Sequence, residues 1–171
     1  HLVHFNQYHY VRSHKEFGYH VIAKNEEAHR STMAGVILVR KDAGIQSLVE
    51  LRGKTIVFGG DRQALMSYII PTFMLREAGL KPGDYLEEFA VNPPNVALAV
   101  FFQRADAGGS GDILFDMPFV RDKVDVSQLI YLKISERVAQ LPWAVRADVT
   151  SVERTRIQQA LLGLKTAAEG S

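Results

Sequence analysis

Short apolar runs alternate along this chain with longer segments in which apolar residues recur every three or four positions. The runs are rich in β-branched residues and end in clusters of glycine, proline, asparagine or charged residues, which is typical of strands followed by turns. They predict strands over residues 2–5, 32–39, 54–58, 89–91, 129–134 and 143–146. Because strands and helices alternate, we expect an α/β fold with a mostly parallel sheet.

The segments with helical periodicity predict a helical turn at 47–51 and helices over 63–78, 96–103, 113–119 and 151–168. The turn Asn92-Pro93-Pro94-Asn95 is able to cap the helix over 96–103, and Asp112 the helix over 113–119. Pro71 either kinks its helix or lies near the first turn, since proline has no N–H to donate. The last helix places its apolar residues on one face, at Val152, Ile157, Leu161 and Leu164.

The composition excludes several classes of function. The 171 residues include 20 Lys and Arg against 19 Asp and Glu, so no surplus of positive charge predicts a nucleic-acid partner. The absence of cysteine excludes disulfides, thiolate metal sites and cysteine nucleophiles. No apolar run reaches the roughly 18 residues that a membrane span requires. Phosphate-loop, nucleophile-elbow and zinc-protease motifs are missing, so we do not expect an enzyme or a resident cofactor.

All six histidines lie within the first 30 residues, from His1 to His29. Imidazole groups gathered in this way are possible ligands of a transition metal. No two of them are spaced four residues apart, so no helix face presents a ligand pair. We therefore favour scattered surface histidines and keep a metal carrier as the weaker alternative.

Polar turns follow the predicted strands at four places, namely 6–10, 59–63, 92–95 and a glycine-rich turn that ends at Asp112. In open α/β sheets ligands bind outside the carboxyl ends of the strands, often at helix N-termini. Each turn alone has an ordinary loop as its simplest interpretation. The four together predict a ligand cleft.

An ordered series of segments resembles the phosphonate- and phosphite-type periplasmic substrate-binding proteins of ABC transporters. The resemblance covers essentially the whole chain. It rests on residues 2–11, 36–45, 48–59, 71–80, 95–100 with 105–108, and 141–146.

The resemblance implies a two-lobed periplasmic binding protein of type II, which closes on its ligand through a hinge of two crossing strands. The central lobe would comprise residues 43–126, and the outer lobe 1–42 with 127–171. The crossing segments would lie near 36–41 and 129–135. The resemblance also implies that the first strand and helix of the outer lobe are absent from this sequence, in which residues 2–5 already have the pattern of a buried strand. The outer lobe is therefore expected to be incomplete, with its missing part supplied by another chain, supplied by a domain-swapped neighbour, or lost.

The family's Ser-Thr-Ser run, which holds phosphonate oxygens, is replaced here by Ala64-Leu65-Met66, and Asp61 would repel a dianion. Arg62 is able to restore anion affinity through a bidentate contact. Tyr10 keeps the family's aromatic position. The ligand-binding residues carried over from the resemblance are Gln7, Tyr10, Asp61, Arg62, Gln63, Ser67, Asn95, Ser110 and Asp112.

The resemblance implies an extracytoplasmic solute-binding protein that holds a small polar or anionic ligand between its lobes. Its partner would be an ABC transporter permease or a membrane sensor. The alternative is a ligand-sensing, accessory or scaffold protein that has kept the fold and lost phosphonate transport. The replaced hydroxyl run motivates that alternative.

Overall fold

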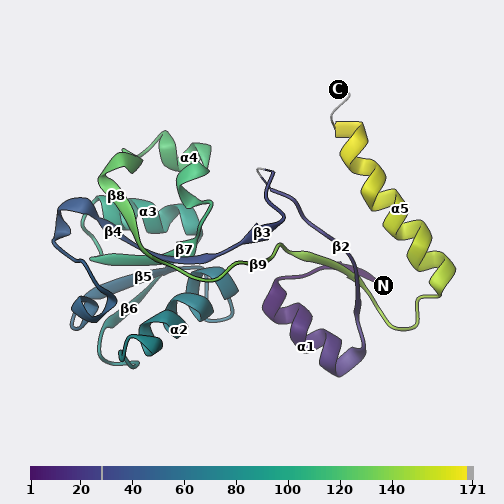
Figure 1. The fold of residues 1–171 in the computed structure, drawn as a ribbon, viewed down its shortest axis with the longest axis horizontal. Coiled ribbons are helices and arrows are strands. Elements are labelled where there is room, and N and C mark those ends of the chain that lie inside the picture. The colour runs from purple at the N-terminus through teal and green to yellow at the C-terminus, as the bar shows by residue number, and fades with distance from the viewer. Residues whose placement is uncertain (28, 169–171) are drawn as a thin grey trace. The chain divides into compact units, whose positions relative to one another are not determined.

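The computed structural model describes residues 1–27 and 29–168, which form two compact units. Unit 1 comprises His1–Thr32 and Ala139–Ser171, and unit 2 comprises Met33–Val138. The chain passes between them twice, at the short paired strands β3 (Thr32–Met33) and β9 (Val138–Ala139) (Figure 1).

The division between the units differs from the boundaries expected at 42/43 and 126/127. It lies at 32/33 and 138/139. The physical reason is that the expected crossing segments form strands of unit 2, which pair with each other inside its sheet. The crossings themselves are the shorter segments that contain β3 and β9.

Unit 2 is built on a five-stranded sheet with the order β6-β5-β7-β4-β8. In that order its strands are Leu86–Ala90, Thr55–Gly59, Ala107–Gly111, Gly35–Arg40 and Leu129–Ile134. Strand β5 is parallel to β6 and β7, whereas β4 is antiparallel to β7 and β8. The sheet is therefore mixed, because β5, β6, β7 and β8 run in one direction and β4 runs against them. The expectation of a mostly parallel sheet is right for the direction of these four strands and wrong for β4, which forms only antiparallel pairs.

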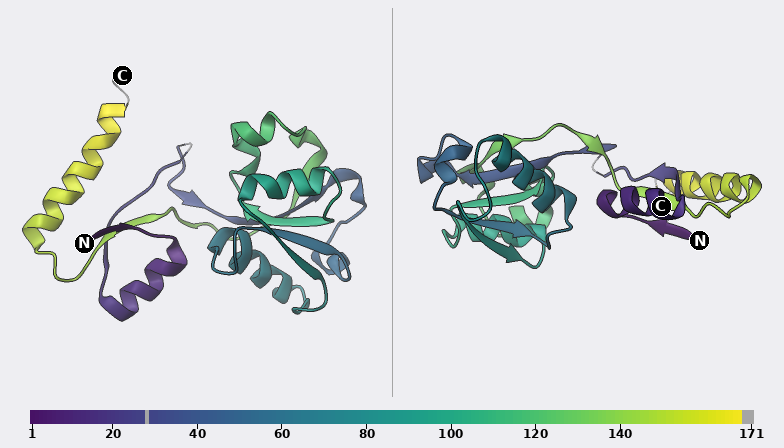
Figure 2. Two further views of the ribbon diagram at one scale, coloured as in Figure 1. Left: turned by 180° about the vertical axis from the view of Figure 1, so that it is seen from behind. Right: turned by 90° about the horizontal axis from the view of Figure 1, so that it is seen from below.

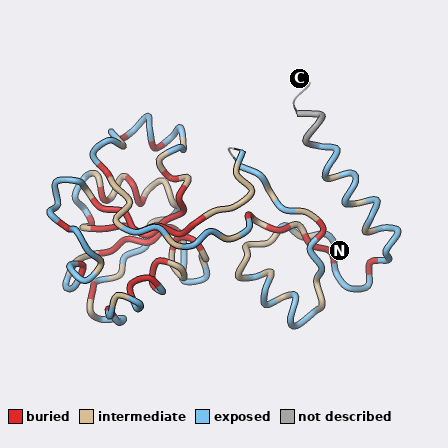
Figure 3. Tube along the Cα trace, viewed as in Figure 1, coloured by how far each residue is buried: buried red, intermediate tan, exposed pale blue. Residues whose placement is uncertain are grey.

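Helices cover both faces of this sheet (Figures 1 and 2). Helix α2 (Ile70–Glu77) packs on one face through a core that includes Phe58 and Leu75. Helices α3 (Pro93–Phe101) and α4 (Pro118–Arg121) cover the other through a core that includes Val96 and Val120. Strands β4, β5 and β7 are consequently buried along most of their length (Figure 3). Single-turn 3-10 helices connect the elements at Lys41–Ala43, Leu48–Leu51, Leu114–Asp116 and Val126–Gln128.

The glycine-rich segment expected to be a turn is the fully buried strand β7. A Cβ at Gly108 would lie 2.3 Å from Val96 Cγ1, and one at Gly109 would lie 2.5 Å from Phe58 Cδ1. The glycines are therefore required because side chains from both layers approach the backbone of the strand closely. They do not mark a change of chain direction.

The predicted helix over 63–78 is divided. A π-helical turn at Leu65–Ile69 leads directly into α2, because Ile69 itself has helical backbone angles. Pro71 is the second residue of α2 and removes one backbone donor from this continuous helical segment. The predicted helix over 113–119 is also divided, into the turn at Leu114–Asp116 and α4.

Unit 1 has a three-stranded antiparallel sheet of order β1-β10-β2, formed by Leu2–His4, Pro142–Val145 and His20–Lys24. Helices α1 (Gln7–Phe17) and α5 (Ser151–Ala168) complete it. Its buried core cluster is small, with Ile22, Val145 and Val149 at its centre. Strand β1 is an edge strand with exposed ends, so the expectation that it is buried is wrong. Along α5, Ile157 and Leu161 pack on this core, whereas Val152 and Leu164 are exposed.

Candidate functional site

The turns after β5, β6 and β7 meet at one edge of the unit 2 sheet. These three strands are parallel, so their carboxyl ends lie at the same edge. The Gly60 amide donates to the Ala90 carbonyl at 2.8 Å. A Cβ at Gly59 would lie 2.9 Å from Pro93 Cα, so the first two turns are in contact. Seven of the nine predicted site residues lie in or just after these strand ends.

The turn after β5 already carries a carboxylate at the start of the helical segment. Oδ1 of Asp61 accepts a hydrogen bond from the Gln63 amide at 2.7 Å. Asp61 and Gln63 are both exposed. The Gln63 amide is therefore already bonded and is not available to an anion at this turn. The Asp61 carboxylate also repels such an anion.

Arg62 is held by groups on β6 and on the π-helical turn. Its guanidinium forms an ion pair with Glu87 at 2.6 Å and donates to the Tyr68 hydroxyl at 2.7 Å. It lies 5.4 Å from the ring centroids of both Tyr68 and Phe89. Burial, with the nearby Glu87 charge, raises the pKa of Tyr68. A ligand anion would have to compete with Glu87 for this guanidinium.

The N-terminus of α3 offers few backbone donors. Its first two positions are Pro93 and Pro94, which have no N–H. The next amide, that of Asn95, donates to Asn92 Oδ1 at 3.1 Å and to the Asn92 carbonyl at 3.2 Å. The capping expected for this turn is therefore confirmed. Because these donors are absent or used, the half-buried Asn95 side chain is the main polar group that α3 brings to the edge.

The end of β7 contains a buried hydroxyl. Ser110 is fully buried, and its Oγ has no hydrogen-bond partner among the described residues. Ser67 is also buried, and its carbonyl oxygen would lie 2.6 Å from a Cβ at Gly109. The π-helical turn that contains Ser67 therefore packs directly on the last residues of β7.

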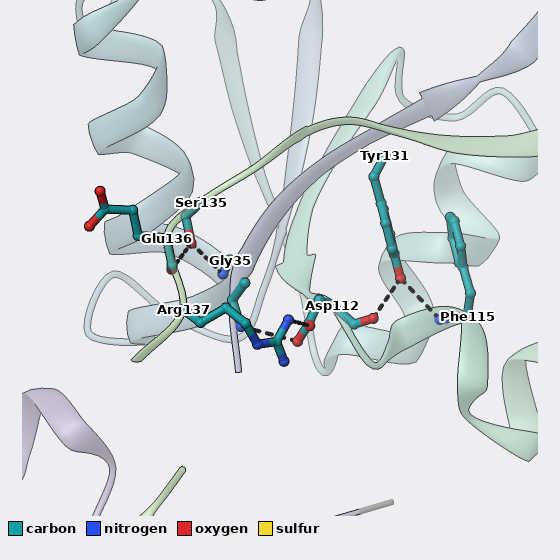
Figure 4. Close-up of polar contacts among 8 residues, drawn as sticks. Gly35, Asp112, Phe115, Tyr131, Ser135, Glu136 and Arg137 are labelled. Carbon is teal, nitrogen blue, oxygen red and sulfur yellow. Dashed lines mark hydrogen bonds and ion pairs between the residues drawn. The ribbon is translucent and has the colours of Figure 1, made fainter. Parts of the chain in front are cut away.

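Asp112 ties the end of β7 to the segments that flank β4 and β8 (Figure 4). Its Oδ1 accepts from the Ala34 amide at 3.1 Å, and its Oδ2 forms an ion pair with Arg137 at 2.6 Å. The Asp112 side chain is 6% exposed, and that of Arg137 is 44% exposed. The Asp112 carbonyl accepts from the Tyr131 hydroxyl at 3.1 Å. The sequence predicted that Asp112 caps the following helix, but the cap position of that helical turn is Ile113. Asp112 instead joins the end of β7 to β8 and to the segments beside β4 and β8.

A second link lies beside it. The Ser135 amide donates to the Gly35 carbonyl at 2.9 Å, and Ser135 Oγ accepts from the Gly35 amide at 3.0 Å (Figure 4). The two segments that lead out of unit 2, before β4 and after β8, are thus hydrogen-bonded to each other and bound to the end of β7 through Asp112. The Arg137 side chain, which pairs with Asp112, is partly exposed beside these segments.

Gln7 and Tyr10 lie in unit 1, on the first turns of α1. Asn6 caps this helix, with its Oδ1 accepting from the Tyr8 amide at 3.0 Å. Gln7 Nε2 donates to the Ala139 carbonyl at 3.1 Å. The Tyr10 ring packs against Phe5 at 6.2 Å and His14 at 5.7 Å between centroids.

Sequence reasoning missed Arg137, Glu87 and Tyr131, which bind the predicted site residues. Asp112 and Arg137 are 25 residues apart, and the pair is visible only once β4 and β8 are known to be neighbours. Within residues 1–27 and 29–168, no group of three or more histidine and carboxylate side chains is arranged to hold a metal. Over the same residues, no helix is long and apolar enough to cross a membrane.

The model of one protein family matches residues 1–171, and the family is described as the periplasmic substrate-binding protein of the phosphonate ABC transporter. Solved structures with a similar fold include a Xanthomonas citri protein bound to ATP, with 21% identity and a TM-score of 0.70. They also include PhnD1 of Prochlorococcus marinus in complex with methylphosphonate, with 18% identity and a TM-score of 0.68. A third is a binding protein component of an ABC phosphonate transporter from Pseudomonas aeruginosa, with 14% identity and a TM-score of 0.68.

These structural matches cover most of this chain and little more than half of the other proteins. The match covers 85% of this chain and 57% of the Xanthomonas protein, and the same shares apply to the Prochlorococcus protein. For the Pseudomonas protein the shares are 93% and 54%. The likeness extends over both units of this chain.

Proposed function

Because the chain belongs to the phosphonate family of periplasmic substrate-binding proteins of ABC transporters, we propose that it binds a small polar ligand with an anionic group. The binding site would be the edge of unit 2 where β5, β6 and β7 end. The observation that carries the proposal is the convergence of three polar turns at this edge, where ligands of open α/β sheets bind. The buried Ser110 hydroxyl, which has no partner among the described residues, supports it.

Side chains more than backbone amides would hold the ligand. The prolines at the start of α3 remove two amides, and Asp61 takes the amide of Gln63. The polar groups at this edge include the Asn95 side chain, the Ser110 hydroxyl and the Arg137 side chain, which a ligand would share with Asp112. With Asp61 at the same edge, a singly charged anion is favoured over a dianion, because like charges repel.

Calorimetric titration of the full chain with methylphosphonate, phosphite, phosphate and methanesulfonate tests this proposal. We expect at least one of these anions to bind, with Ser110→Ala weakening binding by about two- to tenfold because one neutral hydrogen bond is lost. Ser127→Ala, which removes an exposed hydroxyl from a different part of unit 2, serves as the control and leaves binding unchanged. Absence of heat with the whole panel, on chain shown to be folded, would contradict the proposal.

Gln7 and Tyr10 remain predicted ligand residues, and the same titration tests them. We expect Tyr10→Ala to weaken binding. The partner, an ABC transporter permease or a membrane sensor, and the extracytoplasmic location are inferred from the family and form part of the proposal.

A second candidate is an accessory or scaffold protein that has kept the fold without phosphonate transport. Internal contacts already engage residues that the resemblance assigns to ligand binding. The Gln63 amide donates a hydrogen bond to Asp61. Arg62 forms an ion pair with Glu87, and Asp112 forms one with Arg137. This candidate predicts that no anion of the panel stabilises the folded chain. The titration therefore separates the two functions.

A further inference from the structure

Unit 2 contains a pocket of about 460 Å³ at the edge of its sheet opposite the proposed ligand site. It lies where β4 ends, at Arg40, and where β5 and β7 begin, at Thr55 and just after Asp106. Its charged and amide side chains are those of Arg40, Asp42, Lys54, Gln103, Arg104 and Asp106. This volume is within the range of small-molecule sites.

Three cations and two carboxylates line the pocket, so its formal charge is +1. Arg40 is engaged by Asp42 in a bidentate pair, at 2.8 and 2.6 Å. Lys54 lies 3.5 Å from Asp106. No carboxylate of the described residues forms an ion pair with Arg104, whose side chain is therefore the uncompensated charge.

The C-terminus of α3 opposes an anion less than a helix end with free carbonyls would. Its last four carbonyls, which would otherwise present negative dipole ends, all accept hydrogen bonds. The Phe101 carbonyl accepts from Arg40 Nη1 at 2.6 Å. The other three accept from the amides of the residues that follow the helix, and one of these bonds joins the Arg104 amide to the Ala99 carbonyl at 2.8 Å.

Gln103 occupies a backbone position that favours glycine. Its φ is 57°, and its amide donates to the Val100 carbonyl at 3.1 Å. Together with the Arg104 bond, this is the Schellman pattern at a helix C-terminus, in which glycine usually takes the left-handed position. The glutamine accepts a conformational cost that glycine would avoid, and its side chain lines the pocket.

We propose that this pocket is a second ligand site, for a small oxyanion such as phosphate or a carboxylate. The Arg104 guanidinium would provide the charged, forked contact that such an anion favours. The Gln103 amide and the Lys54 ammonium would complete the set of donors. This site is independent of the one at the ends of β5, β6 and β7.

The test is an NMR titration of the isotope-labelled full chain with inorganic phosphate, in which the chemical shifts of the backbone amides are measured. We expect saturable shifts at Gln103 to Asp106 that sodium chloride of equal ionic strength does not reproduce. Arg104→Gln should weaken this binding by about tenfold or more, because a charge-assisted hydrogen bond is lost. Arg76→Gln, which removes an exposed arginine on α2 of the same unit, is the matched control and should leave the shifts unchanged.

A second variant tests the role of the strained residue. Gln103→Gly should raise the melting temperature and weaken phosphate binding at the same time. Absence of saturable shifts at Gln103 to Asp106, equal shifts with chloride, or full binding by Arg104→Gln would overturn the proposal. Binding at the ends of β5, β6 and β7 changes other amides, so the two sites are read separately.

Discussion

Tyr85 is buried in the core between the sheet and α2, at 4% exposure. Burial and, to a smaller extent, the charge of Glu87 raise its pKa from 10.0 to about 12. The unfolded chain releases this proton at lower pH than the folded chain does. The stability that Tyr85 contributes is therefore complete below pH 10 and is lost as the pH rises toward 12.

We expect the urea midpoint of unit 2 to fall between about pH 9 and about pH 11. Tyr85→Phe should reduce this fall, with the part due to Tyr68 remaining because its pKa is raised as well. Tyr19→Phe, in unit 1, is the control. An equal fall in the wild-type and Tyr85→Phe chains would refute the assignment.

Gly109 lies where Phe58 and the Ser67 carbonyl approach the backbone of β7. Gly109→Ala should destabilise the chain by about 1–3 kcal/mol, because the added methyl forces neighbouring groups to move. Gly163→Ala on α5 meets no atom within 4 Å and should stabilise its helix by about 0.5–1 kcal/mol. Urea unfolding of both variants measures the contrast, and equal effects would contradict the close packing.

At the scale of elements, Asp112 and Arg137 join β7 to the segments that flank β4 and β8. Arg137→Gln leaves the Asp112 carboxylate buried without its charged partner. We expect a loss of about 1–3 kcal/mol in the unfolding free energy of unit 2. Arg52→Gln breaks the more exposed pair with Asp84 and should cost less than about 1 kcal/mol. Similar losses in the two variants would show that the Asp112 pair stabilises no more than a surface contact.

Local patterns predicted many of the elements. The strands β5, β8 and β10, the turn at Leu48–Leu51 and helix α5 all lie close to the predicted ranges. Gly53 and Gly79 follow helical segments in the left-handed conformation, where glycine is the usual residue. In these places the information is carried by neighbouring residues.

The mixed sheet and the glycine-rich strand could not be predicted in this way. Strand direction depends on where the chain enters and leaves unit 2, and β4 pairs with β7 and β8 at long range. Gly108 and Gly109 are determined by side chains from α3 and β5 that are distant in sequence. For the same reason the sequence located the polar turns after β5 and β6, but neither the buried strand β7 nor the ion pairs of Arg62 and Asp112.

At the scale of the whole molecule, the two units differ in the size of their cores. Unit 1 buries one small cluster around Ile22, Val145 and Val149, whereas unit 2 buries two larger clusters on opposite faces of its sheet. Because stability depends on buried apolar area, we expect unit 1 to open at lower free energy. Amide hydrogen exchange in sub-denaturing urea measures this. Equal opening free energies for Ile22 and Phe58 would contradict it.

Ligand binding at the ends of β5, β6 and β7 is the central claim. The most direct measurement is an NMR titration of the isotope-labelled full chain with methylphosphonate. The chemical shifts of the backbone amides of Gly60, Asn95 and Gly111 are the readout. The proposed function predicts saturable shifts at all three amides, with one common dissociation constant. In Ser110→Ala that dissociation constant should be larger. A folded chain whose amides at these turns stay unchanged at millimolar methylphosphonate, phosphite, phosphate and methanesulfonate would contradict it.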